Sequence, residues 1–327
     1  MQNCKRLLPV VVLVMLACTT QAQKNILAKL TSPILFKGNN TTAYRDPAAL
    51  YVNGVFYLYF TLVEAEKDGK IYSYTAMSTS KDLKQWSPVK KLTPKDQSLD
   101  YCSPGNVIWY KGEYIMCLQT YPRPAYTVDQ QPRFGTGDAR LYTMRSKDLV
   151  HWTLPELLMV KGPSASFKEM GRMIDPYLVQ DVEDTTKWWC FYKQNGVSMS
   201  YSTDMVNWTF FGYTESGENA CVLVKDKSYI LFHSPKNGIG IKTSSDLKNW
   251  KDVSGLITLG QQQWPWAKGR LTGGVVLDLQ QQRDVRKYIM FFHGSGPLTE
   301  EQGDFDKNAS IGIGWSSDLQ HWSWPGK

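Results

Sequence analysis

The chain has 327 residues, 42% of them hydrophobic and 13% aromatic, and its formal net charge is +7. Its basic residues are scattered without a run of five, which argues against a nucleic-acid-binding surface. Beyond the first residues, no segment is long and apolar enough for a membrane helix, so we expect no membrane span.

Residues 1–22 are predicted to be a secretory signal peptide. Lys5 and Arg6 precede an apolar run, Leu7 to Ala17, that is too short to span a bilayer, and a small-x-small site ends at Ala22. A lipoprotein signal is the alternative, because the segment "MLAC" ends in Cys18. The protein is therefore expected to be periplasmic or secreted, with lipid anchoring at Cys18 left open.

A short motif, Ser-x-Asp followed four residues later by Trp, recurs five times along the rest of the chain. The copies are "SKDLKQW", "SKDLVHW", "STDMVNW", "SSDLKNW" and "SSDLQHW", which end at Trp86, Trp152, Trp208, Trp250 and Trp322. Each follows a strand-like run, its Ser and Asp suit a tight turn, and its Trp begins the next strand. Two further strands joined by a short turn precede most copies, as in "AALYVNGVFYLYF".

Four strands per repeat and five repeats predict an all-β fold, a five-bladed β-propeller. Its four-stranded antiparallel blades surround a central channel and form one domain over residues 23–327. The segment 32–39, "SPILFKGN", is expected to pair with the last blade and close the ring. The four cysteines beyond the signal lie mostly in apolar strand-like runs, so we expect buried free thiols and no zinc site.

The start of the innermost strand carries an acid in several blades. Asp46, Ser103 and Glu218 each stand 11 residues before a tyrosine of the second strand, which predicts one equivalent position for all three. Asp175 takes that position in the third blade, and in the fifth it falls near Thr272. Innermost strands start at one face, so the three carboxylates are expected at one mouth of the channel. Such a cluster suits acid–base cleavage of a glycosidic bond, although Asp-Pro is also ordinary turn chemistry.

These features resemble glycoside hydrolase family 43, over nearly the whole chain after the signal. The resemblance rests on "YRDPAAL", "RMIDPYLV", "GENACVLV" before "SYILFHS", and the five Ser-x-Asp turns. It implies an inverting hydrolase of arabinofuranosides, xylosides or related plant-type glycans. It also implies Asp46 as general base, Glu218 as general acid and Asp175 as the residue that modulates the acid's pKa. No cofactor would be required, although a structural Ca²⁺ in the central channel is possible.

Two departures from the family pattern bear on the site. Cys102-Ser103-Pro104 stands where the family has Trp-Ala-Pro, and Ala220 stands where a proline usually follows the blade-4 Glu. Glu215 and Glu169 are therefore kept as alternative acids.

Further residues are predicted to bind substrate around the carboxylates. Arg45 and Arg270 adjoin the predicted positions, and His293 ends a strand of the fifth blade near the channel. Phe134 and Trp266 lie in long loops and could stack on sugar faces.

Two other functions stay open beside the hydrolase. One is a carbohydrate-binding propeller without catalysis, which the two departures suggest. The other is an inverting phosphorylase, which would need more basic residues at the funnel than Arg45, Arg172 and Arg270. In each case the partner is a carbohydrate, and a monomer is expected.

Overall fold

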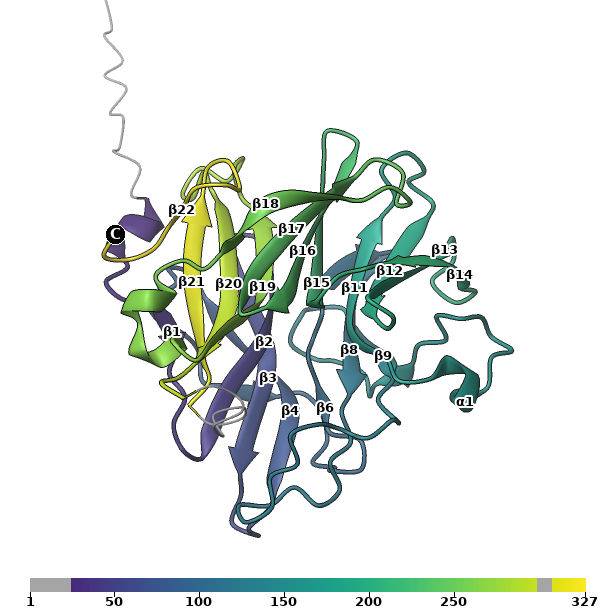
Figure 1. Ribbon diagram of the computed structural model, residues 1–327, viewed down its shortest axis with the longest axis horizontal. Coiled ribbons are helices and arrows are strands. Elements are labelled where there is room, and N and C mark those ends of the chain that lie inside the picture. The colour runs from purple at the N-terminus through teal and green to yellow at the C-terminus, as the bar shows by residue number, and fades with distance from the viewer. Residues whose placement is uncertain (1–24, 299–307) are drawn as a thin grey trace, which may run out of the picture.

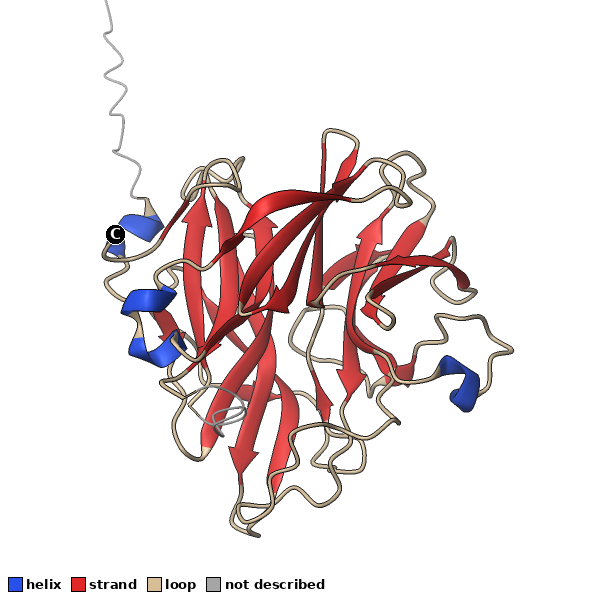
Figure 2. Cartoon of the chain, viewed as in Figure 1, coloured by secondary structure: helices blue, strands red, loops and turns tan. Residues whose placement is uncertain are grey.

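The computed structural model describes residues 25–298 and 308–327. The predicted signal peptide and the alternative lipid-anchor residue Cys18 lie outside the described residues. Figure 2 shows a chain made mostly of strands, with helix confined to single turns. These turns are η1 (Ile26–Lys29), α1 (Phe167–Met170), η2 (Gln261–Gln263) and η3 (Pro265–Ala267).

The strands form five antiparallel sheets that follow one another in chain order. The first sheet contains β2 (Thr42–Val52), β3 (Val55–Ala65), β4 (Ile71–Ser80) and β5 (Lys90–Lys91). The second contains β6 (Tyr101–Cys102) and β7 (Val107–Tyr110), which both pair with β8 (Glu113–Thr120), and then β9 (Leu141–Ser146) and β10 (Glu156–Leu157). The third contains β11 (Ile174–Gln180), β12 (Trp188–Lys193), β13 (Val197–Ser202) and β14 (Thr209–Thr214).

The last two sheets complete the set. The fourth contains β15 (Glu218–Lys225), β16 (Ser228–Lys236), β17 (Gly238–Ser244) and β18 (Lys251–Ile257). The fifth contains β19 (Arg270–Asp278), β20 (Tyr288–Ser295), β21 (Ser310–Ser316) and β22 (Trp322–Ser323), together with β1 (Ile34–Phe36) from the start of the described chain.

The sheets are arranged in a ring, so the protein is a five-bladed β-propeller (Figure 1). The first strands of the blades contact one another around the centre: β19 contacts β2 and β15, and β15 contacts β11. The ring closes in the fifth blade, where β1 pairs with β21 beside the C-terminal β22. This confirms the predicted pairing of residues 32–39 with the last blade. Closure removes most of the free strand edges that an open sheet would expose.

The five Ser-x-Asp turns share one pattern of hydrogen bonds to their Ser and Asp side chains, and four of them, all but the copy ending at Trp208, add a bond from the Trp indole. In the first copy, Ser80 Oγ accepts from the Leu83 N–H, and Asp82 Oδ1 accepts from the next two backbone N–H groups. Leu83 adopts the left-handed region at φ 62°, which costs energy for a branched residue, and these bonds compensate for it. The Trp86 indole N–H then donates to the Leu83 carbonyl and fixes the start of the outer strand.

The second strands of the blades supply much of the core, including Phe60, Phe191, Phe232 and Phe291, all fully buried. Cys102, Cys117, Cys190 and Cys221 are buried free thiols, as predicted. In the part of the chain that the structure describes, no helix is long and apolar enough to cross a membrane.

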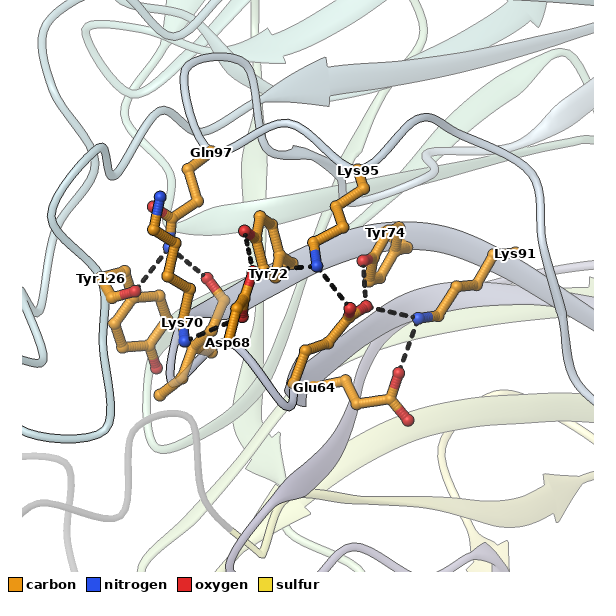
Figure 3. Close-up of polar contacts among 11 residues, drawn as sticks. Glu64, Asp68, Lys70, Tyr72, Tyr74, Lys91, Lys95, Gln97 and Tyr126 are labelled. Carbon is orange, nitrogen blue, oxygen red and sulfur yellow. Dashed lines mark hydrogen bonds and ion pairs between the residues drawn. The ribbon is translucent and has the colours of Figure 1, made fainter.

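A network of charged and aromatic side chains covers one end of the first blade (Figure 3). Lys91 bridges Glu64 and Glu66 at 2.7 and 2.9 Å, and Lys95 bridges Glu66 and Asp68 at 2.7 and 3.0 Å. Lys91 lies over the Tyr74 ring. Exposed ion pairs are individually weak, but a shared network with fixed aromatic supports orders the segment between β4 and β6.

The same segment anchors a long loop, residues 121–138, to the first blade. The Gln97 side-chain amide donates to the carbonyl oxygens of both Ile71 and Tyr126 (Figure 3). Asp100, which is fully buried, accepts from the Ser73 N–H and pairs with Arg123. The loop is thus fixed by buried polar contacts, which positions its aromatic and basic side chains.

Candidate active site

A repeated backbone feature interrupts the first part of the innermost strand in each blade, within β2 in the first blade rather than at its predicted start. One residue per blade takes a left-handed conformation: Asp46, Ser103, Asp175, Asn219 and Gly273 have φ between 42° and 65°. At four of them the pairing register with the second strand shifts, as in a β-bulge, and Ser103 lies in the break between β6 and β7. A bulge at a strand end turns its side chain away from the sheet, here toward the channel mouth.

The prediction that Glu218 is equivalent to Asp46 was wrong by one residue. Asn219 takes the bulge position in the fourth blade, as Asp46 does in the first. Glu218 precedes Asn219 and therefore corresponds to Arg45, which precedes Asp46. The tyrosines used to align the blades differ in their distance from the hairpin turn. Tyr57 is two residues past the turn-closing Val55, whereas Tyr229 directly follows Ser228. In the fifth blade Gly273 takes the position, next to the predicted Thr272.

The three predicted carboxyl groups nevertheless share one pocket. It has a volume of about 1130 Å³, and Asp46, Asp175 and Glu218 all line it. They come from β2, β11 and β15, the innermost strands of three different blades. The prediction that these acids meet at one mouth of the channel is therefore confirmed.

Asp46 is held ionised by its surroundings. The hydroxyls of Thr61 and Ser103 donate to its Oδ2 at 2.9 and 3.1 Å. Burial alone would raise the pKa of Asp46, but the Arg45 guanidinium and the two hydroxyl donors lower it below its usual value. These donors occupy Oδ2, whereas Oδ1 lies 3.6 Å from Nδ1 of His293, whose charge also lowers the pKa of Asp46.

Asp175 has the opposite electrostatic environment. It is 7% exposed, and burial together with the negative charges of Glu218 and Asp46 raises its pKa to about 7. The Asn219 N–H donates to its Oδ2 at 3.0 Å and partly offsets this effect. Asp175 is thus a carboxyl group whose proton is exchanged near neutral pH.

Glu218 is the most accessible of the three acids. Its side chain is 46% exposed, and its Oε2 lies 3.6 Å from the Arg270 guanidinium. Of the alternative acids, Glu215 also lines the pocket. Glu169 does not: it closes a capping box with Ser166 at the start of α1.

Backbone N–H groups at the bulge positions are tied to the preceding blade. Ser103 N–H donates to Thr61 Oγ1, Asp175 N–H to Gln119 Oε1, and Gly273 N–H to Ser234 Oγ. The first blade follows the same rule through the fifth, because Asp46 N–H donates to Nδ1 of His293.

The fourth blade breaks this rule. The matching position on β12 is Lys193, which pairs across the sheet with Ile174 as Thr61 pairs with Arg45. An ammonium group cannot accept a hydrogen bond. The Asn219 N–H therefore donates to the Asp175 carboxylate, which joins two pocket residues from neighbouring blades.

The predicted substrate-binding residues have different outcomes. Arg45, Arg270 and Phe134 line the pocket, and Phe134 is 62% exposed there. His293 lies behind Asp46 as its backbone acceptor and is 2% exposed. Trp266 is not among the pocket-lining residues, because η3 packs it against Phe292 with ring centroids 5.9 Å apart.

Several pocket residues were not predicted as site residues, among them Asn219, Gln119, Lys193 and Arg123. Counting back from the hairpin turns rather than from the tyrosines would have identified Asn219. Gln119 and Lys193 end second strands, like the predicted His293, so the strand repeat contained a signal for them.

A small cavity continues the channel below the pocket. It holds about 30 Å³ and is lined by the bulge residues together with Pro, Gly, Ala, Val and Cys side chains. Among the described residues, no group of three or more His, Cys, Asp or Glu side chains could hold a metal ion. The cavity has room for about one water, and a structural Ca²⁺ in the channel stays a prediction.

No protein-family model matches the sequence, and neither does any curated protein. Solved structures do resemble the fold. A thermostable family-43 glycoside hydrolase has a TM-score of 0.60 at 14% identity, over 91% of this chain and 96% of that one. A family-117 glycoside hydrolase of the marine bacterium Zobellia galactanivorans has a TM-score of 0.59 at 14% identity, over 87% and 88%. An exo-1,5-α-L-arabinanase from a bovine ruminal metagenomic library has a TM-score of 0.53 at 14% identity, over 86% and 95%. The chain therefore has the five-bladed propeller fold found in glycoside hydrolases of families 43 and 117.

Proposed function

We propose that the protein is an exported glycoside hydrolase that cleaves arabinofuranoside- or xyloside-like bonds in plant-type polysaccharides or oligosaccharides with inversion. The observation that carries this proposal is the meeting of Asp46, Asp175 and Glu218 in one pocket at the channel mouth. The names of the similar structures support the substrate class, since they include an arabinanase and a β-xylosidase. Release from the cell, or anchoring at Cys18, and action as a monomer are part of the same proposal.

Asp46 acts as the general base. Its lowered pKa keeps the carboxylate ionised, and Thr61 and Ser103 fix its orientation through one oxygen. The other oxygen takes a proton from the water that attacks the sugar's anomeric carbon. Direct attack by water from the face opposite the leaving group inverts the configuration at that carbon.

Glu218 acts as the general acid and protonates the departing oxygen. Its exposure gives a bound sugar access to the carboxyl group, and Arg270 lies beside it. Asp175 interacts electrostatically with Glu218, because the Glu218 charge contributes to the raised pKa of Asp175. This electrostatic coupling supports the role proposed for Asp175 as the residue that modulates the acid.

Two alternatives have specific support. Asn219 rather than an acid occupies the fourth-blade bulge, which favours a carbohydrate-binding propeller without catalysis. The pocket also holds more basic residues than the sequence indicated, eight arginines and lysines, which favours a phosphorylase.

One experiment separates the three functions. Purified protein is incubated with aryl arabinofuranosides, xylosides and galactosides, and with arabinan, xylan and galactan, each with and without inorganic phosphate. We expect reducing sugar to be released without phosphate. Release that needs phosphate and yields a sugar 1-phosphate would assign a phosphorylase. Tight sugar binding without any release would assign a binding protein.

A further inference from the structure

The wall of the pocket is basic even though its catalytic centre is acidic. Among the described residues, eight arginine and lysine side chains line it, against five carboxyl groups, and buried Asp100 behind the wall balances one of the arginines, Arg123. Neutral sugars need hydrogen-bonding groups but no excess of positive charge. The excess is therefore a feature of the pocket that hydrolysis of a neutral glycoside does not explain.

Arg172 is the basic residue whose contacts best indicate a ligand. It is half-buried, it lines the pocket three residues before Asp175, and its Nη2 donates to the Tyr121 hydroxyl at 3.4 Å. Among the described residues, no carboxylate oxygen lies within 4.0 Å of its guanidinium. A partly buried guanidinium whose one described hydrogen bond goes to a phenol has N–H donors left for a planar anion.

Tyr121 keeps this guanidinium in place. Its ring lies 5.4 Å from the Arg172 guanidinium carbon and 5.6 Å from that of Arg123. Arg123 is itself fixed by buried Asp100, so its charge is balanced and it serves as a support. The result is a rigid phenol beside an arginine that has no described carboxylate oxygen within 4.0 Å and acts on Asp175 only at longer range.

Lys193 is a second such cation, on the other strand of the same blade hairpin. It is half-buried, lines the pocket, and donates to the Ser216 carbonyl at 3.2 Å. No described carboxylate lies within 4.0 Å of its ammonium group either. Arg172, just before β11, and Lys193, at the end of β12, therefore each present a positive charge with no described carboxylate oxygen within 4.0 Å.

We propose that the pocket binds an acidic sugar, one that carries a carboxylate or a sulfate, with the anionic group held by Arg172 and the Tyr121 hydroxyl beside Asp175. This deepens the proposed function and rests on it, since it names the substrate class of the same pocket. The planar fork of Arg172 matches a carboxylate through two parallel N–H donors. Lys193 and the basic wall add attraction at longer range.

The test measures binding by calorimetry, without turnover. Wild-type protein is titrated with galacturonate, glucuronate and galactose 6-sulfate, with galactose and glucose as neutral partners, and with inorganic phosphate. We expect at least one acidic sugar to bind about 10- to 100-fold more tightly than its neutral partner, as charge-assisted hydrogen bonds provide. This preference should shrink as salt rises. Equal binding of the partners, or no binding by any acidic sugar, would overturn the proposal.

A matched pair of variants assigns the preference to Arg172. Arg172→Met should lose most of the preference for the acidic sugar over its neutral partner. Arg283→Met should keep this preference, because Arg283 is exposed between β19 and β20. An unfolding curve checks that each variant is folded, and Arg172→Gln replaces the Met variant if that one is not. A folded Arg172 variant with the full preference would overturn the assignment.

The remaining outcomes separate this inference from the hydrolase proposal. Monosaccharides are not cleaved, so an acidic-sugar preference counts for the inference even if no glycoside is hydrolysed. Cleavage of neutral glycosides at the same rate by wild type and Arg172→Met would support the hydrolase and overturn the acidic substrate. Phosphate that binds more tightly than the sugar acids and displaces them would assign the anion to free phosphate, which also overturns the proposal.

Discussion

The backbone N–H of Asp46 donates a 3.1 Å hydrogen bond to Nδ1 of His293, which lies 247 residues later in the chain. The bond joins the first blade to the fifth at the edge of the pocket, while β1 joins them at the outer rim. Nδ1 of the same ring also lies 3.6 Å from the Asp46 carboxylate, so His293 fixes both the backbone and the side chain of Asp46. The position of the proposed base thus depends on closure of the propeller.

Replacing His293 should therefore affect both folding and catalysis. His293→Ala leaves the Asp46 N–H without its acceptor in a buried site, which should lower the free energy of unfolding by about 1–3 kcal/mol. Misplacement of the base should lower kcat by up to about 100-fold. His293→Asn, whose side-chain oxygen can take the place of Nδ1, should retain more of both. Denaturant unfolding and kinetics check this, and equal losses in the two variants would contradict it.

Lys193 offers a way to separate Asp175 from Asn219. Lys193→Gln supplies an amide oxygen like that of Gln119 in the second blade, so it should compete for the Asn219 N–H. Asp175 would lose a hydrogen bond that lowers its pKa, and that pKa should rise further. The limb of the pH–rate profile that reports Asp175 should then move to higher pH. Lys193→Met removes the charge without adding an acceptor and should not show this shift, so equal shifts would contradict the explanation.

Asp175 should also make stability depend on pH. Its pKa in the folded protein, about 7, lies above that of an ordinary aspartate, so the folded state binds the proton more tightly. Wild type should lose stability as the pH rises from about 4 through about 7. Asp175→Asn should show a smaller fall in the free energy of unfolding over this pH range. Asp284→Asn, which changes an exposed aspartate, should show the same fall as wild type. Urea unfolding across this range checks the slopes, and identical slopes for wild type and Asp175→Asn would contradict the prediction.

The assignment of Glu218 as acid predicts a dependence on the leaving group. Glu218→Gln should retain much of its activity on a dinitrophenyl glycoside, whose leaving group needs no proton. It should lose about 10²–10⁴-fold on a sugar leaving group. Asp46→Asn should lose activity on both substrates, because water must be activated in each case. If Glu215→Gln, which changes the alternative acid that lines the pocket, shows the leaving-group dependence instead, Glu218 is the wrong acid.

Inversion predicts the configuration of the first product. An enzyme with room for water between base and sugar has its two carboxyl groups about 6.5–9.5 Å apart and releases the inverted anomer. Proton NMR during the first minutes of the reaction, before mutarotation, should show the inverted anomer of the released sugar. Early product with retained configuration would make Asp46 a nucleophile rather than a base.

The sequence by itself determined the repeat and hence the architecture. Each Ser-x-Asp turn is closed by bonds within a few residues, so its spacing in the chain directly reports its structure. The Asp-Pro pairs before strand-like runs likewise predicted that Asp46 and Asp175 lie near the beginning of innermost strands. A local pattern repeated five times predicts the blades even though 247 residues separate Asp46 from its acceptor His293.

Only the tertiary structure decided which residue fills each bulge and what surrounds it. Glu218 and Asn219 are adjacent in sequence, and cross-strand register alone gives the bulge to Asn219. Trp266 packs on Phe292 instead of lining the pocket. Burial of its aromatic ring between η3 and the fifth blade stabilises the fold, and the sequence does not show which of the two places the ring takes. The raised pKa of Asp175 likewise depends on its burial and on the charges of Glu218 and Asp46 from two other blades. These effects come from segments far apart in the chain, so no local sequence pattern reports them.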